Sequence, residues 1–285
     1  MNYPALSPHY PELSPLAVSE KPLKNSLILF SLIIPTYNES QTIVDLLEQL
    51  CAILENYCPG GYEVVVVDDD SPDRTWQKVA EFSRHAPQVR LVRRCQEKGL
   101  ATAVVRGWQV ARGSVLGVMD GDLQHPPEVV ARLLGAVLQG ADLAVATRYG
   151  LAGNLGQWSW LRQLLSRGAQ GLGWLLLPQV VGRVTDPLSG YFVVRRSAIA
   201  QQVLKPLGYK ILIEVLARGR IQEIEEVGYG FQNRQGGKSK VTPQQFLSYG
   251  LHLLRLRWSL GMGFLRGRGG QRVSQGFQKQ DFWKT

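Results

Sequence analysis

The feature that most constrains the fold is a series of short, continuous apolar runs, each followed by residues with helical spacing. These runs are rich in Val, Ile and Leu, and we expect strands at residues 27–34, 62–67, 89–93, 114–119 and 142–147. Strands that are apolar on both sides are buried on both faces, as in parallel sheets whose connections are helices. The sequence therefore predicts an α/β domain in which helices cover both faces of a parallel sheet.

The stretches between the runs repeat apolar residues every three or four positions, which predicts helices at residues 41–57, 74–85, 99–111 and 127–139. Beyond residue 150 the pattern changes. We expect helices there at residues 157–177, 209–219 and 243–265, a loop leading into a strand at 186–194, and a last strand at 224–232.

Polar clusters stand where the predicted strands end, at residues 37–39, 68–70, 120–122 and 148–149. In open parallel sheets, ligands bind beyond the carboxyl ends of the strands. We therefore expect these clusters to meet at one edge of the sheet and to form the functional site.

One cluster contains Asp120 and Asp122, with Gln124 two residues further on. Two carboxylates one residue apart in a loop can both reach a hard cation, Mg²⁺ or Mn²⁺, which would neutralise a diphosphate leaving group. An acidic turn that caps the following helix explains the same pattern, since Pro126 and Pro127 come next. The residues alone leave both interpretations open.

The three consecutive aspartates at residues 68–70 are costly unless they bind something or stay hydrated. A strand-end carboxylate can accept the N–H edge of a nucleotide base. A solvated turn, favoured by the Ser71-Pro72 pair, is the alternative.

Basic residues near predicted loops are candidates for phosphate binding, although each taken alone is more typical of a surface charge. They are Lys98, Arg148, Arg162, Arg234, Lys238 and Lys240. The histidines His85, His125 and His252 lack metal-binding spacing, and we assign them no chemistry. The absence of a Walker or G-x-G-x-x-G pattern argues against P-loop NTPases and dinucleotide-binding enzymes.

The formal net charge of +9 indicates anionic partners. Three cysteines without a C-x-x-C pair argue against a disulfide framework or a zinc site and favour a reducing, cytoplasmic compartment. No uninterrupted apolar run reaches about 18 residues, so no transmembrane helix is predicted.

The chain divides into four parts. Residues 1–24, with five prolines, predict a flexible leader before a domain at 25–242. Residues 243–272 form a basic helical segment with Leu247, Leu251, Leu254 and Trp258 on one face, and 273–285 form a polar tail. Such a helix either lies in a membrane interface or packs on the domain.

Together the motifs resemble family 2 glycosyltransferases, and among them the dolichol-phosphate mannose synthases. The resemblance covers residues 32–240 and rests on the motifs at 34–39, 67–73, 98–100, 119–127, 148–149, 186–192, 208–214 and 237–240. It implies a GT-A type, Rossmann-like fold with a mixed, mainly parallel sheet. One departure is Gly-Leu-Ala at residues 99–101, where the family often has Gly-Leu-Gly.

The resemblance also implies site residues and a reaction. Pro35, Tyr37, Glu39, Val67, Asp69 and Lys98 would bind the nucleotide sugar, with Asp120, Arg234 and Lys240. Asp120, Asp122 and Gln124 would hold the metal, and Asp122, Arg148, Ser189 and Lys210 would act in catalysis near the phosphates. The implied reaction moves mannose from GDP-mannose to dolichyl or polyprenyl phosphate at the cytoplasmic side of a membrane.

A phosphate acceptor is already an anionic nucleophile at neutral pH, so the enzyme needs no general base, and we expect single displacement with inversion. A glucosyltransferase that uses UDP-glucose is the alternative within this class. A nucleotidyltransferase would carry a Gly/Lys-rich signature near the first strand, where this chain has Tyr37-Asn38-Glu39 instead. The absence of a recognised nucleic-acid-binding motif argues against a nucleic-acid-binding protein. The need for a membrane subunit is left open.

Overall fold

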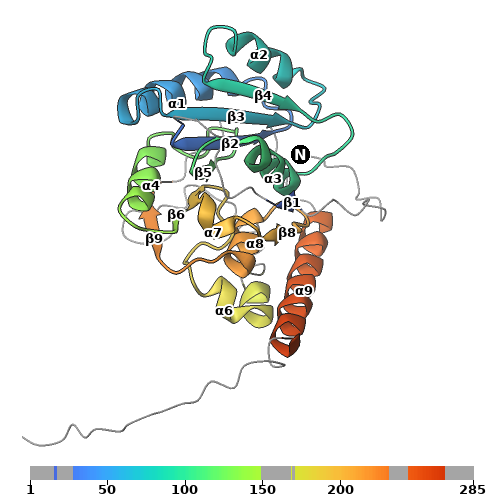
Figure 1. Ribbon diagram of the computed structural model, residues 1–285. Helices are drawn as coiled ribbons and strands as arrows, with labels where there is room; N and C mark the ends of the chain where they lie inside the picture. The colour runs from blue at the N-terminus through green and yellow to red at the C-terminus, as the bar shows by residue number, and fades with distance from the viewer. Residues whose placement is uncertain (1–15, 18–27, 149–167, 169–170, 231–242, 267–285) are drawn as a thin grey trace, which may run out of the picture.

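The computed structural model describes residues 16–17, 28–148, 168, 171–230 and 243–266. Its centre is a seven-stranded sheet with strand order β4-β3-β2-β5-β7-β6-β9 (Figure 1). The strands are β2 (Phe30–Thr36), β3 (Tyr62–Asp68), β4 (Val89–Arg93), β5 (Val115–Val118), β6 (Leu143–Thr147), β7 (Phe192–Arg195) and β9 (Ile224–Gly228). All neighbouring strands are parallel except where β7 pairs with β5 and β6.

Helices cover both faces of this sheet, as the apolar runs predicted. One face carries α1 (Ile43–Tyr57), α2 (Thr75–Phe82) and α4 (Val129–Leu138). The other carries α3 (Leu100–Val110), α6 (Pro178–Val181), α8 (Ile211–Arg218) and α9 (Pro243–Arg266), while the short α7 (Arg196–Ile199) follows β7.

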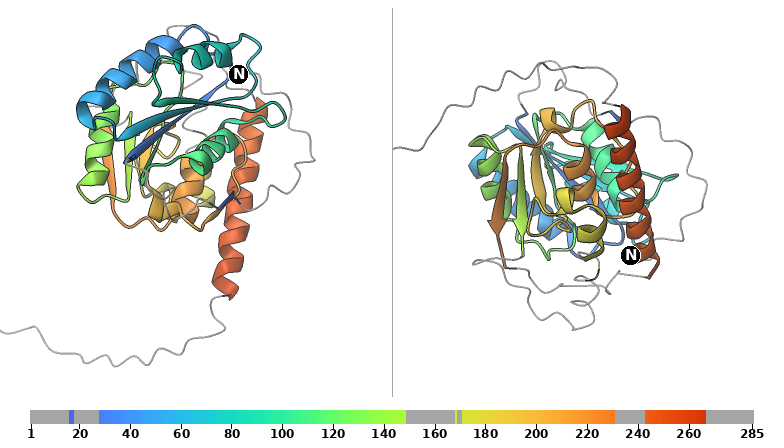
Figure 2. Two further views of the ribbon diagram at one scale, coloured as in Figure 1. Left: turned by 45° about the horizontal axis from the view of Figure 1, so that its top comes forward. Right: turned by 90° about the horizontal axis from the view of Figure 1, so that it is seen from below.

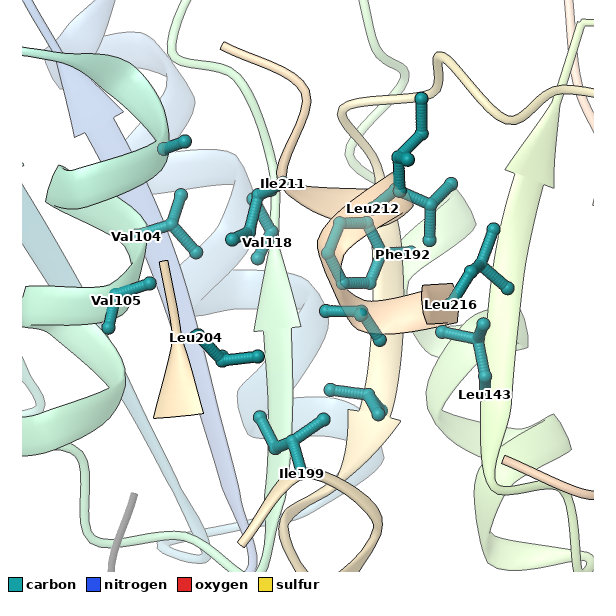
Figure 3. Close-up of a cluster of buried hydrophobic side chains, with 14 of the residues drawn as sticks. Val104, Val105, Val118, Leu143, Phe192, Ile199, Leu204, Ile211, Leu212 and Leu216 are labelled. Carbon is teal, nitrogen blue, oxygen red and sulfur yellow. The ribbon is translucent and has the colours of Figure 1, made fainter. Parts of the chain in front are cut away.

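Successive residues of the central strands enter opposite cores, because side chains alternate across a strand. Ile33 packs beneath α3, whereas Leu32 and Ile34 pack on the opposite face. Figure 3 shows the first core, where Val104 of α3 points toward Val118 of β5, and Phe192 of β7 lies beside Leu212 of α8. Both faces of the central strands are therefore covered by mainly apolar cores.

The sequence located the five early strands but gave no direction for the strand that follows residue 186. That strand, β7, runs antiparallel and separates β5 from β6. Its amino end consequently lies at the same edge of the sheet as the carboxyl ends of its neighbours. The mixed, mainly parallel sheet implied by the resemblance is confirmed.

Two further differences concern the ends of the chain. Within the expected leader, Leu16–Ala17 forms strand β1, which pairs antiparallel with β8 (Val203–Leu204), so these two residues are not a free segment. The expected helix at 157–177 lies largely outside the described residues, although 171–176 are helical.

Helix α9 runs along one side of the domain, and its last turns project past it (Figures 1 and 2). Tyr249, Leu253 and Leu256 are buried against the domain, whereas Leu251 and Trp258 are 54% and 73% exposed. The helix therefore packs on the domain and also presents an apolar surface. No helix among the described residues is long and apolar enough to cross a membrane.

Candidate functional site

The polar clusters that follow the strands meet at one edge of the sheet, as expected. The carboxyl ends of β2, β3, β5 and β6 and the amino end of β7 all lie there. Three non-glycine residues in these turns have positive φ angles, namely Asn38 (58°), Asp70 (54°) and Leu123 (56°). Non-glycine residues rarely adopt this conformation, and such residues concentrate at functional sites.

The three consecutive aspartates have different partners, which explains how their charges are tolerated. Asp68 is fully buried and accepts hydrogen bonds from the Thr36 hydroxyl (2.9 Å) and from the Ser71 amide (2.8 Å). Asp70 accepts one from Nε of Arg93 at 2.7 Å. Each carboxylate is paired, so the cluster is a set of turn supports as well as a candidate ligand site.

Asp69 is only 1% exposed and holds the loop that precedes α3. Its Oδ1 accepts a hydrogen bond from Nε of Arg94 at 2.7 Å, and its Oδ2 accepts one from the Gly99 amide at 2.6 Å. Burial raises the pKa of the Asp69 carboxyl against the opposing influence of Arg94. This pairing anchors the backbone next to the exposed Lys98, whose Nζ lies 5.4 Å from the centre of the Tyr37 ring.

The loop after β5 carries the three residues expected to hold a metal, Asp120, Asp122 and Gln124. The backbone N–H of Gln124 donates a hydrogen bond to Oδ1 of Asp122 at 3.2 Å, which closes the turn through Leu123. The Thr42 hydroxyl donates to the Gly121 carbonyl at 3.0 Å and ties the loop to the start of α1.

The donor set of this loop fits a hard cation such as Mg²⁺ or Mn²⁺. Such ions prefer oxygen ligands, and Mg²⁺ typically takes one or two protein carboxylates together with substrate phosphates. Within the described ranges, no group of three or more His, Cys, Asp or Glu residues is placed to hold a metal. A metal held by Asp120, Asp122 and Gln124 would need further oxygen ligands, such as those of a bound diphosphate.

The loop before β7 approaches the Asp120–Gln124 loop closely at Gly190. A Cβ atom on Gly190 would lie 2.7 Å from Oδ2 of Asp120, well inside van der Waals contact. Only glycine allows the Asp120 carboxylate to lie against this backbone. The two loops therefore form one unit.

Arg148 and Asp186 form a bidentate ion pair at the same edge. Nε and Nη2 of Arg148 donate to the two carboxylate oxygens of Asp186 at 2.7 and 2.8 Å, and the Asp186 side chain is fully buried. Such pairs are strong and geometrically specific. Asp186 therefore fixes the guanidinium of Arg148 in one orientation.

Two predicted catalytic residues support the loop before β7 from inside. The Ser189 hydroxyl, 4% exposed, donates to the Ala146 carbonyl at 2.8 Å. The Lys210 ammonium, just before α8, donates to the Leu188 carbonyl at 2.7 Å. In this structure the Ser189 hydroxyl is therefore engaged with the backbone and is not presented at the surface.

The remaining candidates differ in accessibility. Pro35 and Val67 are buried register partners in β2 and β3, so any contact of theirs with a ligand would go through the backbone. Glu39 is 8% exposed, and its amide donates to the Thr75 hydroxyl. Arg162, Arg234, Lys238 and Lys240 lie outside the described residues.

Sequence reasoning missed three residues at this edge: Arg94, His125 and Tyr229. Arg94 carries no motif of its own, and Tyr229 lies 104 positions from the His125 ring that it contacts. His125 directly follows Gln124, and that position was the one signal that could have identified it.

Comparison with known proteins gives consistent similarities. The profile described as glycosyl transferase family 2 matches residues 31–201. A dolichol-phosphate mannosyltransferase of Pyrococcus furiosus is 44% identical over 230 residues, which are 80% of this chain and 64% of that protein, so the match spans less than two thirds of the relative. A polyprenol monophosphomannose synthase of Mycolicibacterium smegmatis is 35% identical over 78% of this chain and 83% of its own length.

Among solved structures, the fold resembles a glucosyl-3-phosphoglycerate synthase of Mycobacterium tuberculosis in complex with Mn²⁺, UDP-glucose and phosphoglyceric acid. The TM-score is 0.58 at 22% identity, and the match covers 88% of this chain and 85% of that one. At this identity the similarity concerns the fold alone.

Proposed function

Because the chain belongs to glycosyl transferase family 2, we propose that it transfers mannose from GDP-mannose to a polyprenyl phosphate, such as dolichyl phosphate, and releases GDP. The observation that carries the proposal is that the Asp120–Gln124 loop and the Arg148–Asp186 pair lie around the same tyrosine, Tyr229, at the carboxyl edge of the sheet. This edge combines oxygen donors for a cation with a fixed positive charge, which suits two phosphorylated substrates.

The donor lies across the ends of β2, β3 and β5. Tyr37, Glu39 and Asp69 contact the nucleoside, and Lys98 lies near its phosphates. Asp120, Asp122 and Gln124 would hold a Mg²⁺ or Mn²⁺ ion, which would supply positive charge to the diphosphate leaving group. Pro35 and Val67 contact the nucleotide sugar through their backbone atoms.

The acceptor phosphate needs no general base, because its second pKa near 6 leaves it largely dianionic at neutral pH. One of its oxygens attacks C1 of mannose, the bond from C1 to the GDP oxygen breaks, and the configuration at C1 inverts. Arg148, Lys210, Arg234 and Lys240 supply the positive charge that brings two anions together. Retention of configuration in the product would contradict this single displacement.

Residues 243–272 place the domain at the cytoplasmic surface of a membrane, where the lipid acceptor resides. Leu251, Leu254 and Trp258 of α9 are 54%, 45% and 73% exposed, and Arg255 and Arg257 stand among them. An apolar face with interspersed arginines is typical of helices that lie in an anionic lipid interface.

Vesicle flotation tests this placement. Truncation at residue 242 is a poor test, since it would also remove buried α9 side chains. The triple variant Leu251→Gln, Leu254→Gln, Trp258→Gln keeps those contacts and should lose binding to anionic vesicles. Leu138→Gln makes the same kind of substitution at a 46% exposed position on α4, and this variant should bind vesicles as the wild type does. Equal flotation of all three proteins would refute the role of α9.

The donor is tested by incubating polyprenyl phosphate and Mg²⁺ or Mn²⁺ with labelled GDP-mannose or, separately, labelled UDP-glucose. We expect a metal-dependent, chloroform-soluble product from GDP-mannose alone. Asp122→Ala should abolish it, whereas Asp45→Ala, at an exposed position on α1, should not. A product from UDP-glucose alone would leave the reaction class intact and replace the sugar.

A further inference from the structure

His125 lies buried at the edge of the site, in contact with the loop that carries the candidate metal ligands. Its side chain stands between two tyrosines, with ring centroids 5.2 Å from Tyr191 and 5.6 Å from Tyr229. The residue is 4% exposed. This packing fixes the plane of the imidazole ring.

Both nitrogens of the ring face defined polar atoms. Nδ1 lies 2.8 Å from the Tyr229 hydroxyl, and Nε2 lies 3.4 Å from Oδ2 of Asp120. A carboxylate oxygen only accepts, so a favourable contact requires a proton on Nε2. In a neutral ring Nδ1 then carries the lone pair and accepts from Tyr229.

Tyr229 can serve as that donor because it keeps its proton. Burial raises the pKa of the Tyr229 phenol well above its ordinary value, and the nearby carboxylates of Asp186 and Asp120 act in the same direction. The chain of contacts therefore runs in one direction, from the Tyr229 O–H to Nδ1, and from Nε2–H to Asp120.

Gly190 limits the same carboxylate oxygen from another side. A Cβ at Gly190 would lie 2.7 Å from Oδ2 of Asp120, so the backbone of the loop before β7 lies against that oxygen. His125 and Gly190 together leave Asp120 little freedom to rotate. An oriented carboxylate binds a metal more tightly, because no orientational freedom is lost on binding.

We propose that His125, oriented by Tyr229, is a positioning residue that orients the Asp120 carboxylate for metal binding. The proposal rests on the metal role of Asp120 stated above. A purely structural histidine that fills the space between two tyrosines would affect folding, whereas this role also affects the affinity for the ion.

Two conservative variants separate these roles. The amide nitrogen of Gln reaches the position of Nε2 and can donate to Asp120, whereas that of Asn reaches only the position of Nδ1. With GDP present and no acceptor, Mn²⁺ binding measured by electron paramagnetic resonance should weaken about 10- to 100-fold in His125→Asn, the usual effect of losing an outer partner of a metal ligand. His125→Gln should bind markedly more tightly than His125→Asn. The exposed His85→Gln is the control.

A second measurement needs no metal. The ¹⁵N chemical shifts of His125 in the metal-free protein should be those of the Nε2–H tautomer. In the Mn²⁺-binding experiment above, Tyr229→Phe should weaken binding in the same direction as His125→Asn. Equal Mn²⁺ affinity of wild type and His125→Asn, or a proton on Nδ1 alone, would overturn the proposal. Absence of Mn²⁺ binding by the wild type would instead refute the metal site itself.

Discussion

Replacement of Gly190 by alanine tests the geometry of the site with a single methyl group. The added Cβ would lie 2.7 Å from Oδ2 of Asp120 and 3.1 Å from both Cγ and Oδ1. Ordinary van der Waals contact begins at 3.4 Å, so the carboxylate must move by about 0.7 Å. The φ angle of Gly190 lies outside the left-handed region, so the backbone itself tolerates alanine.

The size of the effect follows from this displacement. A misplacement of about 1 Å at a reacting centre costs about 100-fold in rate, so a shift of about 0.7 Å should lower kcat/KM by 10- to 100-fold. That factor corresponds to about 1.4–2.7 kcal/mol of transition-state stabilisation. The half-saturating concentration of Mn²⁺ should rise in parallel, while the unfolding temperature changes little.

The assay is steady-state transfer of mannose from GDP-mannose to polyprenyl phosphate over a series of Mn²⁺ concentrations. Gly171→Ala is the matched control, because a Cβ there meets nothing within 4 Å. A folded Gly190→Ala enzyme with kcat/KM and Mn²⁺ dependence within twofold of the wild type would refute the proposal that Asp120 holds the metal during the reaction.

Three further predictions concern stability. Glu214→Gln should lower the free energy of unfolding by about 3–5 kcal/mol, because the buried Glu214 pairs with His252 and Arg218. Burial opposes ionisation of Glu214, but His252 and Arg218 lower the Glu214 pKa below 4.5. The stability that ionised Glu214 contributes is therefore present above pH 4.5 and is lost as the pH falls through the folded-state pKa. Urea titrations at several pH values should show the difference between wild type and Glu214→Gln shrinking in acid. Arg148→Lys keeps the charge but not the two-pronged contact with Asp186, so urea unfolding should show a loss of about 1.5–3 kcal/mol and the transfer assay a lower kcat. Phe192→Ala should cost about 3–5 kcal/mol by the same urea method, since this fully buried ring packs edge-on against Trp108, and an unchanged midpoint would contradict the core described.

The sequence predicted the strands of the sheet well because their apolar runs report burial on both faces directly. It also predicted that the polar clusters meet at one edge of the sheet, because the carboxyl ends of parallel strands lie together there. The direction of β7 could not be obtained in this way, because a short buried strand has the same pattern in either direction.

The partners of individual side chains were beyond the sequence pattern for a different reason. Asp69 meets Arg94 only through the folded loop before α3, and His125 meets Tyr229 across 104 residues. The sequence does not distinguish an aspartate that binds a ligand from an aspartate that forms an ion pair with an arginine. Similarly, the apolar spacing of α9 did not reveal that Tyr249, Leu253 and Leu256 face the domain while Leu251 and Trp258 face outward.

The nature of the acceptor is the central claim, and one measurement addresses it directly. Labelled GDP-mannose and Mg²⁺ are supplied to the wild-type protein with polyprenyl phosphate, with the free polyprenol, or with 3-phosphoglycerate, which is a water-soluble phosphate monoester. Partition between chloroform and water then separates the products. We predict label in chloroform with polyprenyl phosphate alone. A labelled mannosyl-phosphoglycerate, separated from unreacted GDP-mannose by anion-exchange chromatography, together with no label in chloroform, would contradict the assignment.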